Sequence, residues 1–158
     1  MTKRLILDHP ALRRLFFFGA LATRGVTLGV RGIARDGEGR VFLVRHTYLS
    51  GWHLPGGGVE RGETAEEAMV REFREEGDIR TEGPLRLLGL FHNNAGSALD
   101  HVALYEAPAF TVLRPKAPDR EIAEGGFFPA DALPEGTSRG TLARLREFRE
   151  GLSPALRW

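Results

Sequence analysis

Cysteine is absent from this chain of 158 residues. Disulfide bonds, thiolate zinc sites and cysteine nucleophiles are therefore excluded, whereas the compartment stays open because a cytoplasmic protein needs no cysteine. The five histidines lack the HExxH spacing of helical zinc sites. No apolar run reaches the ~20 residues that cross a bilayer, and a net charge of +1 gives no basis for bulk attraction to nucleic acid or membrane. We expect a cytoplasmic protein that binds its ligand at a local site.

The N-terminal region is apolar and aromatic, with the run LFFFGALA at residues 15–22. It loosely resembles a signal peptide, but Asp8, Pro10 and two arginines precede the short apolar run. We therefore expect residues 1–22 to form an apolar helical extension that packs on the domain or contacts a second copy in a homodimer.

The length favours a single domain over residues 1–158. Residues 26–34 and 40–46 are rich in β-branched and apolar side chains and flank the turn-forming residues 36–39, which predicts a hairpin. Further elements are expected as strands at 85–92 and 101–107, an edge strand within 108–118, and a C-terminal helix within 138–152, centred on about 141–151. Strands interleaved with one central and one terminal helix predict an α/β fold with a mixed β-sheet between helices.

The central helix carries a cluster of carboxylates. Its expected start is Thr64, which forms a capping-box pattern with Glu67. Glu72, Glu75 and Glu76 follow at i, i+3 and i+4, so they share one face with the apolar residues of the helix. Like charges at this spacing cost about 0.2–0.5 kcal/mol in a helix, and burial raises that cost unless a cation neutralises them. The alternative is a solvated charged face, but the placement favours a site for Mg²⁺.

A glycine-rich loop, PGGG at residues 55–58, precedes this helix. Three residues without a Cβ let the backbone approach an ion or a phosphate closely. The loop matches neither GxxxxGK[ST] nor GxGxxG. Such glycines alone most often form a turn, but their fixed distance from the carboxylates makes the combination specific.

Together, loop and helix resemble the Nudix hydrolase family. The family motif reads Gly, five residues, Glu, seven residues, Arg-Glu, an apolar residue, any residue, Glu-Glu, any residue, Gly and an apolar residue. The positions that match at the correct spacing are Gly57, Glu63, Arg71, Glu72, Phe73, Glu75, Glu76 and Ile79. Asp78 stands where the motif has its second glycine, so either Asp78 adopts the left-handed cap or Gly77 takes over the helix end. The similarity covers about residues 25–134 and implies a Nudix-type α/β/α sandwich.

The resemblance implies a set of metal ligands. Glu72, Glu75 and Glu76 would hold Mg²⁺ or Mn²⁺ together with the carbonyl of Gly57. Arg71 would orient the glutamates through charge-assisted hydrogen bonds. In the same reading Glu63 would support the loop and the helix.

Residues outside the motif are less constrained. Glu121 is our first candidate for an additional general base and Glu124 our second, with an exposed loop glutamate as the alternative for either. Arg45 is a candidate phosphate clamp. Candidates to shape a base or sugar pocket, with loop packing as the alternative, are Tyr48, Trp52, His92 and Asn93.

The function implied by the resemblance is a metal-dependent pyrophosphohydrolase. It would cleave the diphosphate bond of a nucleoside diphosphate linked to another moiety, such as ADP-ribose, a nucleoside triphosphate or a capped RNA end. The only nucleic-acid partner that we then expect is an RNA 5′ end, and we expect no membrane partner. The alternative is a nucleotide-sensing module that keeps the fold without catalysis. Lost glutamates would mark such a module, and all of them are present.

Overall fold

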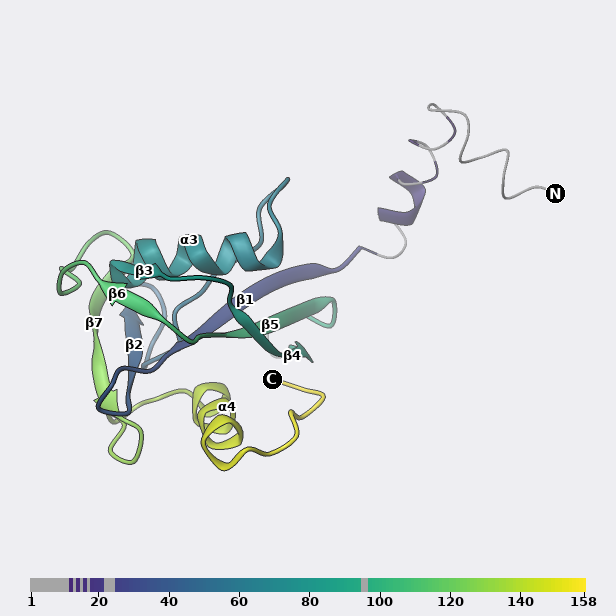
Figure 1. Ribbon diagram of the computed structural model, residues 1–158. Coiled ribbons are helices and arrows are strands. Elements are labelled where there is room, and N and C mark those ends of the chain that lie inside the picture. Colours follow the sequence, from purple (N-terminus) through teal and green to yellow (C-terminus); the bar gives the residue numbers. More distant parts are fainter. Residues whose placement is uncertain (1–11, 13, 15, 17, 22–24, 95–96) are drawn as a thin grey trace.

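The structure is a computed structural model that describes residues 12, 14, 16, 18–21, 25–94 and 97–158 (Figure 1). The predicted apolar extension at residues 1–22 lies mostly outside the described residues. Its described large side chains, Leu12, Phe16, Phe18 and Leu21, are exposed. Within the described residues, no helix is both long and apolar enough to cross a membrane.

From residue 27 onward the chain consists of strands, with one helix after the second strand and another after the last. In order, the elements are β1 (Thr27–Ala34), β2 (Arg40–His46), α3 (Ala65–Gly77), β3 (Ile79–Thr81), β4 (Arg86–His92), β5 (Asp100–Ala107), β6 (Phe110–Val112), β7 (Ile122–Pro129) and α4 (Arg139–Glu150). The predicted strands at 85–92 and 101–107 are thus β4 and β5. The predicted edge strand within 108–118 is β6, and the C-terminal helix begins two residues before the expected position 141.

The strands pair in three groups. β1 runs parallel to β5, which runs antiparallel to β4, so the three-stranded sheet β1-β5-β4 is mixed. β2 pairs antiparallel with β7, and β3 pairs antiparallel with β6. α3 lies on one side of the strands and α4 on the other (Figure 1). The predicted α/β/α sandwich is confirmed.

The predicted hairpin of residues 26–34 and 40–46 is wrong. The turn forms, because Asp36 donates its N–H to the Arg40 carbonyl at 2.9 Å, but the strands then separate after the single bridge between Arg35 and Val41. The second edge of β1 is taken by the glycine loop: Val30 and Gly32 donate their N–H groups to loop carbonyls at 2.8 and 2.9 Å. β1 therefore positions the loop, and β2 is left to pair with β7.

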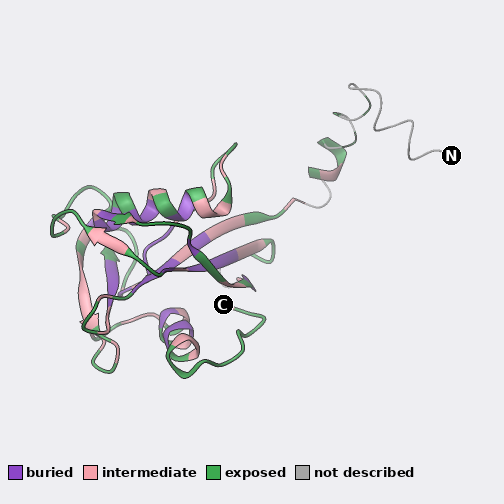
Figure 2. Cartoon of the chain, in the orientation of Figure 1, coloured by how far each residue is buried: buried purple, intermediate pink, exposed green. Residues whose placement is uncertain are grey.

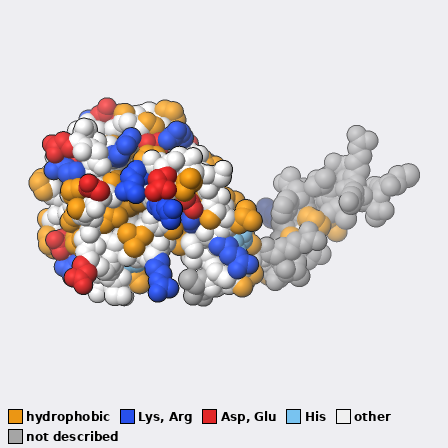
Figure 3. All heavy atoms as spheres, turned by 90° about the horizontal axis from the view of Figure 1, so that it is seen from below, with side chains coloured by type: hydrophobic (Ala, Val, Ile, Leu, Met, Phe, Trp, Pro, Cys, Tyr) orange, Lys and Arg blue, Asp and Glu red, His pale blue; other side chains and the backbone are white. Residues whose placement is uncertain are grey.

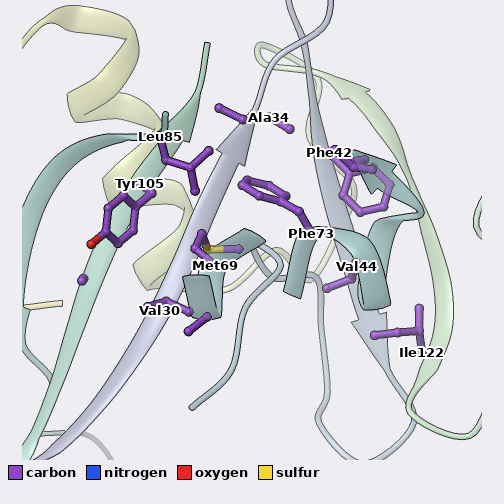
Figure 4. Packing of buried hydrophobic residues seen from close by; sticks show 13 residues of the cluster. Val30, Ala34, Phe42, Val44, Met69, Phe73, Leu85, Tyr105 and Ile122 are labelled. Atoms are coloured by element: carbon purple, nitrogen blue, oxygen red, sulfur yellow. The ribbon is translucent and has the colours of Figure 1, made fainter. Parts of the chain in front are cut away.

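Two hydrophobic clusters hold the layers together. The first lies between α3 and the strands, where Met69 and Phe73 project from the helix toward Val30 and Phe42 (Figure 4). The second lies under α4 and includes Leu145. Buried residues line the inner faces of both helices (Figure 2). Each fully buried side chain of this size contributes roughly 1.5–3 kcal/mol, so the inner face of α3 is firmly anchored.

Acidic and basic side chains are interspersed over the face of the molecule seen in Figure 3. This agrees with a formal net charge of +1. Recognition of a charged ligand must therefore depend on individual side chains and not on a field of one sign.

Candidate active site

The start of α3 is fixed by the predicted capping box. The Thr64 hydroxyl accepts the N–H of Glu67 at 3.2 Å, and the Glu67 carboxylate accepts the N–H of Thr64 at 2.7 Å. Each bond satisfies a donor that the first turn of a helix leaves open. The rotation of α3 about its axis, and with it the direction of every carboxylate further along, is set from this end.

The three glutamates of the cluster differ in burial. Glu72 and Glu76 are buried, at 8% and 5% exposure, and face the strands as predicted. The side chain of Glu75 is 59% exposed and lines a hollow beside Glu76, so this carboxylate faces a cleft and not the interior. At 100° per residue, position 75 lies on the flank of the buried stripe and reaches its edge.

Arg71 links the helix carboxylates to the preceding loop. One terminal nitrogen donates to Glu72 at 2.7 Å and to Glu75 at 3.2 Å, and the other donates to Glu63 at 2.9 Å and to the Gly58 carbonyl at 3.0 Å. The hydrogen bond that Arg71 donates to Glu63 is the main cause that raises the pKa of Arg71, and the same bond lowers the pKa of Glu63. Arg71 therefore stays charged and organises the carboxylates around it.

Burial and the neighbouring Arg71 act in opposite directions on the pKa of Glu72. Desolvation by burial raises the pKa of Glu72, and the hydrogen bond from Arg71 opposes that rise. The nearby negative charge of Glu76 raises it further. A carboxylate in this situation is stabilised by any additional cation.

Glu76 is held by two donors from different elements. Its Oε1 lies 2.7 Å from Nε2 of His46, and its Oε2 accepts the N–H of Gly56 at 2.8 Å. His46 is buried and was not identified from the sequence. The signal was available, because alternation along β2 places position 46 on the same inward face as Phe42 and Val44.

The glycine loop is packed too tightly for a side chain at Gly56. The φ of this residue is +147°, and a Cβ would lie 2.8 Å from the carbonyl carbon of Val30 and collide with its oxygen. Arg31 supports the loop from the other side by donating to the carbonyls of Leu54 and Gly56 at 2.9 and 2.8 Å. The loop backbone is therefore fixed before any ligand arrives.

The donors at this site fit a hard divalent cation. All are carboxylate or carbonyl oxygens. A Cβ on Gly57 would collide with the Glu72 carboxylate, so the absence of a side chain at Gly57 leaves room for the carboxylate oxygens of Glu72. The Gly57 carbonyl accepts one N–H, from Val30 at 2.8 Å, and retains a second lone pair. Within the part of the chain that the structure describes, no three acidic or histidine side chains already form a metal cluster. The carboxylates are directed instead to Arg71 and His46.

A hollow of about 390 Å³ borders the carboxylates. Its lining residues are Glu75, Glu76, Asp119, Arg120, Glu121 and Ile122. The structure thus brings Glu121, the first candidate for a general base, to the α3 carboxylates. Glu124, the second candidate, lies instead 2.9 Å from the guanidinium of Arg45.

The predicted substrate contacts divide into packed and exposed residues. Arg45 is paired with Glu124, and its guanidinium lies 5.9 Å from the ring of Trp52. Trp52 is only 8% exposed and meets Phe128 edge-on at 4.7 Å, which favours the packing alternative for this residue. Tyr48 is 73% exposed, with its ring 5.2 Å from that of His46. Of the three, Tyr48 offers the most surface to a ligand.

His92 and Asn93 close the connection between β4 and β5. Nε2 of His92 lies 2.9 Å from the Ala98 carbonyl, and Asn93 donates to the Asp100 carboxylate at 2.7 Å. These contacts agree with the packing alternative for both residues.

Asp78 resolves the departure from the family motif. Its φ is +49°, and its N–H donates to the carbonyl of Arg74 at 3.1 Å, so Asp78 itself forms the left-handed cap. Gly77 does not take over this role, since its φ is not positive. A Cβ at Gly77 would lie 3.0 Å from atoms of Phe42 and Ile79, so the glycine serves close packing. The carboxylate of Asp78 pairs with Arg114 at 3.1 Å.

Comparison with known sequences identifies relatives of this chain. A family model described as NUDIX domain matches residues 25–151. The 8-oxo-dGDP phosphatase NUDT18 of Mus musculus is 36% identical over 83 residues, which are 52% of this chain and 25% of that protein. An RNA pyrophosphohydrolase of Shewanella baltica is 50% identical over 44 residues, 28% of this chain and 25% of that protein. The chain thus matches about a quarter of the length of these curated relatives.

Comparison with solved structures gives matches over most of the chain. A MutT NUDIX hydrolase from Burkholderia pseudomallei has a TM-score of 0.65 at 27% identity, covering 76% of this chain and 95% of that one. An ADP-ribose pyrophosphatase from Streptococcus suis has a TM-score of 0.58 at 20% identity, covering 78% and 91%. The second match bears on the fold alone.

Proposed function

The chain belongs to the NUDIX domain family, and from this premise we propose that it is a metal-dependent pyrophosphohydrolase. Its substrate would be a nucleoside diphosphate linked to another moiety, such as a nucleotide sugar of the ADP-ribose type or a nucleoside triphosphate. Relatives named as RNA pyrophosphohydrolases and as an 8-oxo-dGDP phosphatase support this class of reaction. A cytoplasmic location is part of the same proposal.

The observation that carries the proposal is the burial of two carboxylates on the face of α3 that meets the glycine loop. Glu72 and Glu76 are both buried, and a loop N–H donates to Glu76 at 2.8 Å. Burying negative charge is costly unless a cation or hydrogen bonds compensate for it. A divalent cation and a polyphosphate supply that compensation in the bound state.

The residues have distinct proposed roles. Glu72, Glu75, Glu76 and the Gly57 carbonyl would hold Mg²⁺ or Mn²⁺. The bound ion supplies polarisation of phosphate oxygens and a more acidic water. Arg71 keeps Glu72 oriented, as its 2.7 Å hydrogen bond indicates.

The remaining groups act on the water and on Glu76. Glu121 would accept the proton of the attacking water as its oxygen bonds to phosphorus and the anhydride P–O bond breaks. His46, 2.7 Å from Glu76, fixes the orientation of that carboxylate from β2. Glu121 lines the same hollow as Glu75 and Glu76, which is consistent with proton transfer beside the metal ligands.

The test is a phosphatase-coupled screen of nucleoside diphosphate derivatives with added Mg²⁺ or Mn²⁺. We expect Glu76→Gln and Glu121→Gln to lower turnover by ~10²-fold or more with the fold retained by circular dichroism. Glu135→Gln is the matched control, because this exposed glutamate has no ion-pair partner in the described part of the chain. Near wild-type turnover of Glu76→Gln, or of the wild type in EDTA, would overturn the proposal.

The same screen separates the enzyme from the sensing module. A sensor would bind nucleotides in a metal-dependent manner and release no product from any substrate. Asp78 was the single departure that could hint at a sensor, and the structure accommodates Asp78 as the helix cap without disturbing the carboxylates. The catalytic alternative is therefore the one that we carry forward.

A further inference from the structure

A nearly buried lysine connects α3 to the loop that carries Glu121. The side chain of Lys116 is 7% exposed. Its ammonium donates to the backbone carbonyl of Glu75 and to the Asp119 carboxylate, each at 2.6 Å. A desolvated ammonium is retained only where such acceptors compensate for lost water. The contact therefore joins the loop firmly to the C-terminal part of α3.

The loop is also tied along its own backbone. Oδ1 of Asp119 accepts the N–H groups of Glu121 and Ile122 at 2.9 and 2.7 Å. Directly after β2, the Thr47 hydroxyl donates to the Arg120 carbonyl at 2.9 Å, and the Thr47 N–H donates to the Glu121 carbonyl at 2.8 Å. Residues 119–122 are therefore held both by α3 and by the residue that follows β2.

Arg120 is the cation that this arrangement presents to the hollow. It lines the hollow with four acidic residues, Glu75, Glu76, Asp119 and Glu121. Glu75 is paired with Arg71 and Asp119 with Lys116, and a carboxylate oxygen of Glu76 lies 2.7 Å from Nε2 of His46. Arg120 has no ion-pair partner among the residues described. Arg45, the phosphate clamp expected from the sequence, is instead paired with Glu124 at 2.9 Å.

We propose that Arg120 binds the phosphate oxygens of the substrate, and that Lys116 and Asp119 are positioning residues that hold Arg120 opposite Glu75 and Glu76. A planar guanidinium can bind phosphate through two parallel hydrogen bonds. Among the described residues that line the hollow, Ile122 is the one with an apolar side chain, so this region receives the diphosphate and not the base. The inference rests on the proposed function for the identity of the substrate class.

Binding of methylenediphosphonate, a diphosphate analogue that is not hydrolysed at its bridge, tests the role of Arg120 by isothermal titration calorimetry with Mg²⁺ present. We expect Arg120→Ala to weaken binding by about 10-fold or more, as for loss of a charge-assisted hydrogen bond. Arg120→Lys should bind with intermediate affinity, because it keeps the charge and loses the paired geometry. Arg80→Ala is the matched control, since Arg80 is exposed and lines a separate groove formed by α3 and β3.

A double-variant cycle tests the positioning role of Lys116. If Lys116 acts through Arg120, the single variant Lys116→Met binds the analogue more weakly than the wild type does. The double variant with Lys116→Met and Arg120→Ala then binds no more weakly than Arg120→Ala by itself. A merely structural role would give additive losses. Circular dichroism and the midpoint of urea unfolding check that each variant is folded under the assay conditions.

The outcomes separate this inference from the proposed function. Wild-type affinity in Arg120→Ala, an equal loss in Arg80→Ala, or no binding by the wild type would each overturn the role of Arg120. In those cases, turnover by the wild type in the substrate screen would still support the proposed pyrophosphohydrolase activity. Conversely, Arg120-dependent binding without turnover of any substrate would support the phosphate site and contradict the proposed pyrophosphohydrolase activity.

Discussion

The backbone N–H of Gly56 lies 2.8 Å from Oε2 of Glu76, and this hydrogen bond joins the glycine loop to α3. The other carboxylate oxygen of Glu76 meets His46 on β2 at 2.7 Å. One buried carboxylate therefore connects three separate parts of the chain. A displacement of the loop is therefore transmitted to α3, because close-packed protein interiors transmit strain between neighbouring segments.

Gly56→Ala should disable the site and destabilise the fold. The positive φ and the collision with the Val30 carbonyl mean that either the loop or β1 must move. We expect a loss of about 2 kcal/mol or more in the free energy of unfolding, measured by urea titration, together with loss of turnover. Gly58→Ala is the matched control two residues away, since a Cβ there meets nothing within 4 Å. Equal effects of the two substitutions would contradict this reading of the loop.

Asp78→Ala should cost about 1 kcal/mol, because alanine pays the full penalty of the left-handed conformation and loses the pair with Arg114. Asp78→Gly restores the residue of the family motif, and relief of backbone strain then offsets the loss of the ion pair. We expect its unfolding midpoint to stay close to that of the wild type. Arg114→Ala isolates the ion pair, which on the surface contributes no more than about 1 kcal/mol. If Asp78→Gly proved as unstable as Asp78→Ala, the explanation by conformation would be wrong.

Much of the site was predictable because its signals are local. The capping box of Thr64 and Glu67 and the shared face of Glu72 and Glu76 follow from spacing along one helix, whereas the sequence left the helix end open between Asp78 and Gly77. Spacing of 3.6 residues per turn carries such information without knowledge of the tertiary structure. The same rule put Glu75 with its neighbours, although its position on the flank leaves it exposed.

The contacts that were missed depend on pairing between distant segments. The hairpin prediction failed because a turn does not decide which strands pair, and β1 found its partner in β5, some 70 residues later. β3 escaped notice because three residues show no alternation. Lys116 meets α3 across 41 positions of sequence, and nothing in its neighbourhood distinguishes it from an exposed lysine.

Acid should weaken the tie around Asp119 in a defined pH range. Hydrogen bonds from the Ile122 N–H and from Lys116 lower the pKa of Asp119 from about 3.8 to about 2. Above pH 3.8 both the folded and the unfolded carboxyl are ionised, and the stabilisation is fully present. As the pH falls from 3.8 to 2, the unfolded state binds a proton first, so the contribution of Asp119 to stability is lost.

The measurement is the free energy of unfolding by urea from pH 5 to pH 2 for the wild type and Asp119→Asn. We expect the difference between them to be greatest above about pH 4 and to shrink toward pH 2. Both proteins share all other carboxylates, so their common acid destabilisation cancels in the difference. A difference that is constant over this range would show that ionisation of Asp119 contributes nothing.

Divalent metal should raise the thermal stability of the protein without any substrate. A cation that binds only the folded state stabilises it by RT ln(1 + [L]/Kd), about 1.4 kcal/mol at ten times the dissociation constant. For a domain of about 150 residues this corresponds to a rise of roughly 3–6 °C in Tm. Burial raises the pKa of Glu72, and a bound cation favours its charged form, so the gain should depend on this residue. Glu72→Gln and Glu76→Gln should therefore lose the rise with Mg²⁺ or Mn²⁺, whereas Glu135→Gln should keep it. The same rise in Tm for all three variants would show that the metal binds elsewhere. A rise that persists in EDTA would show that it is not caused by the metal.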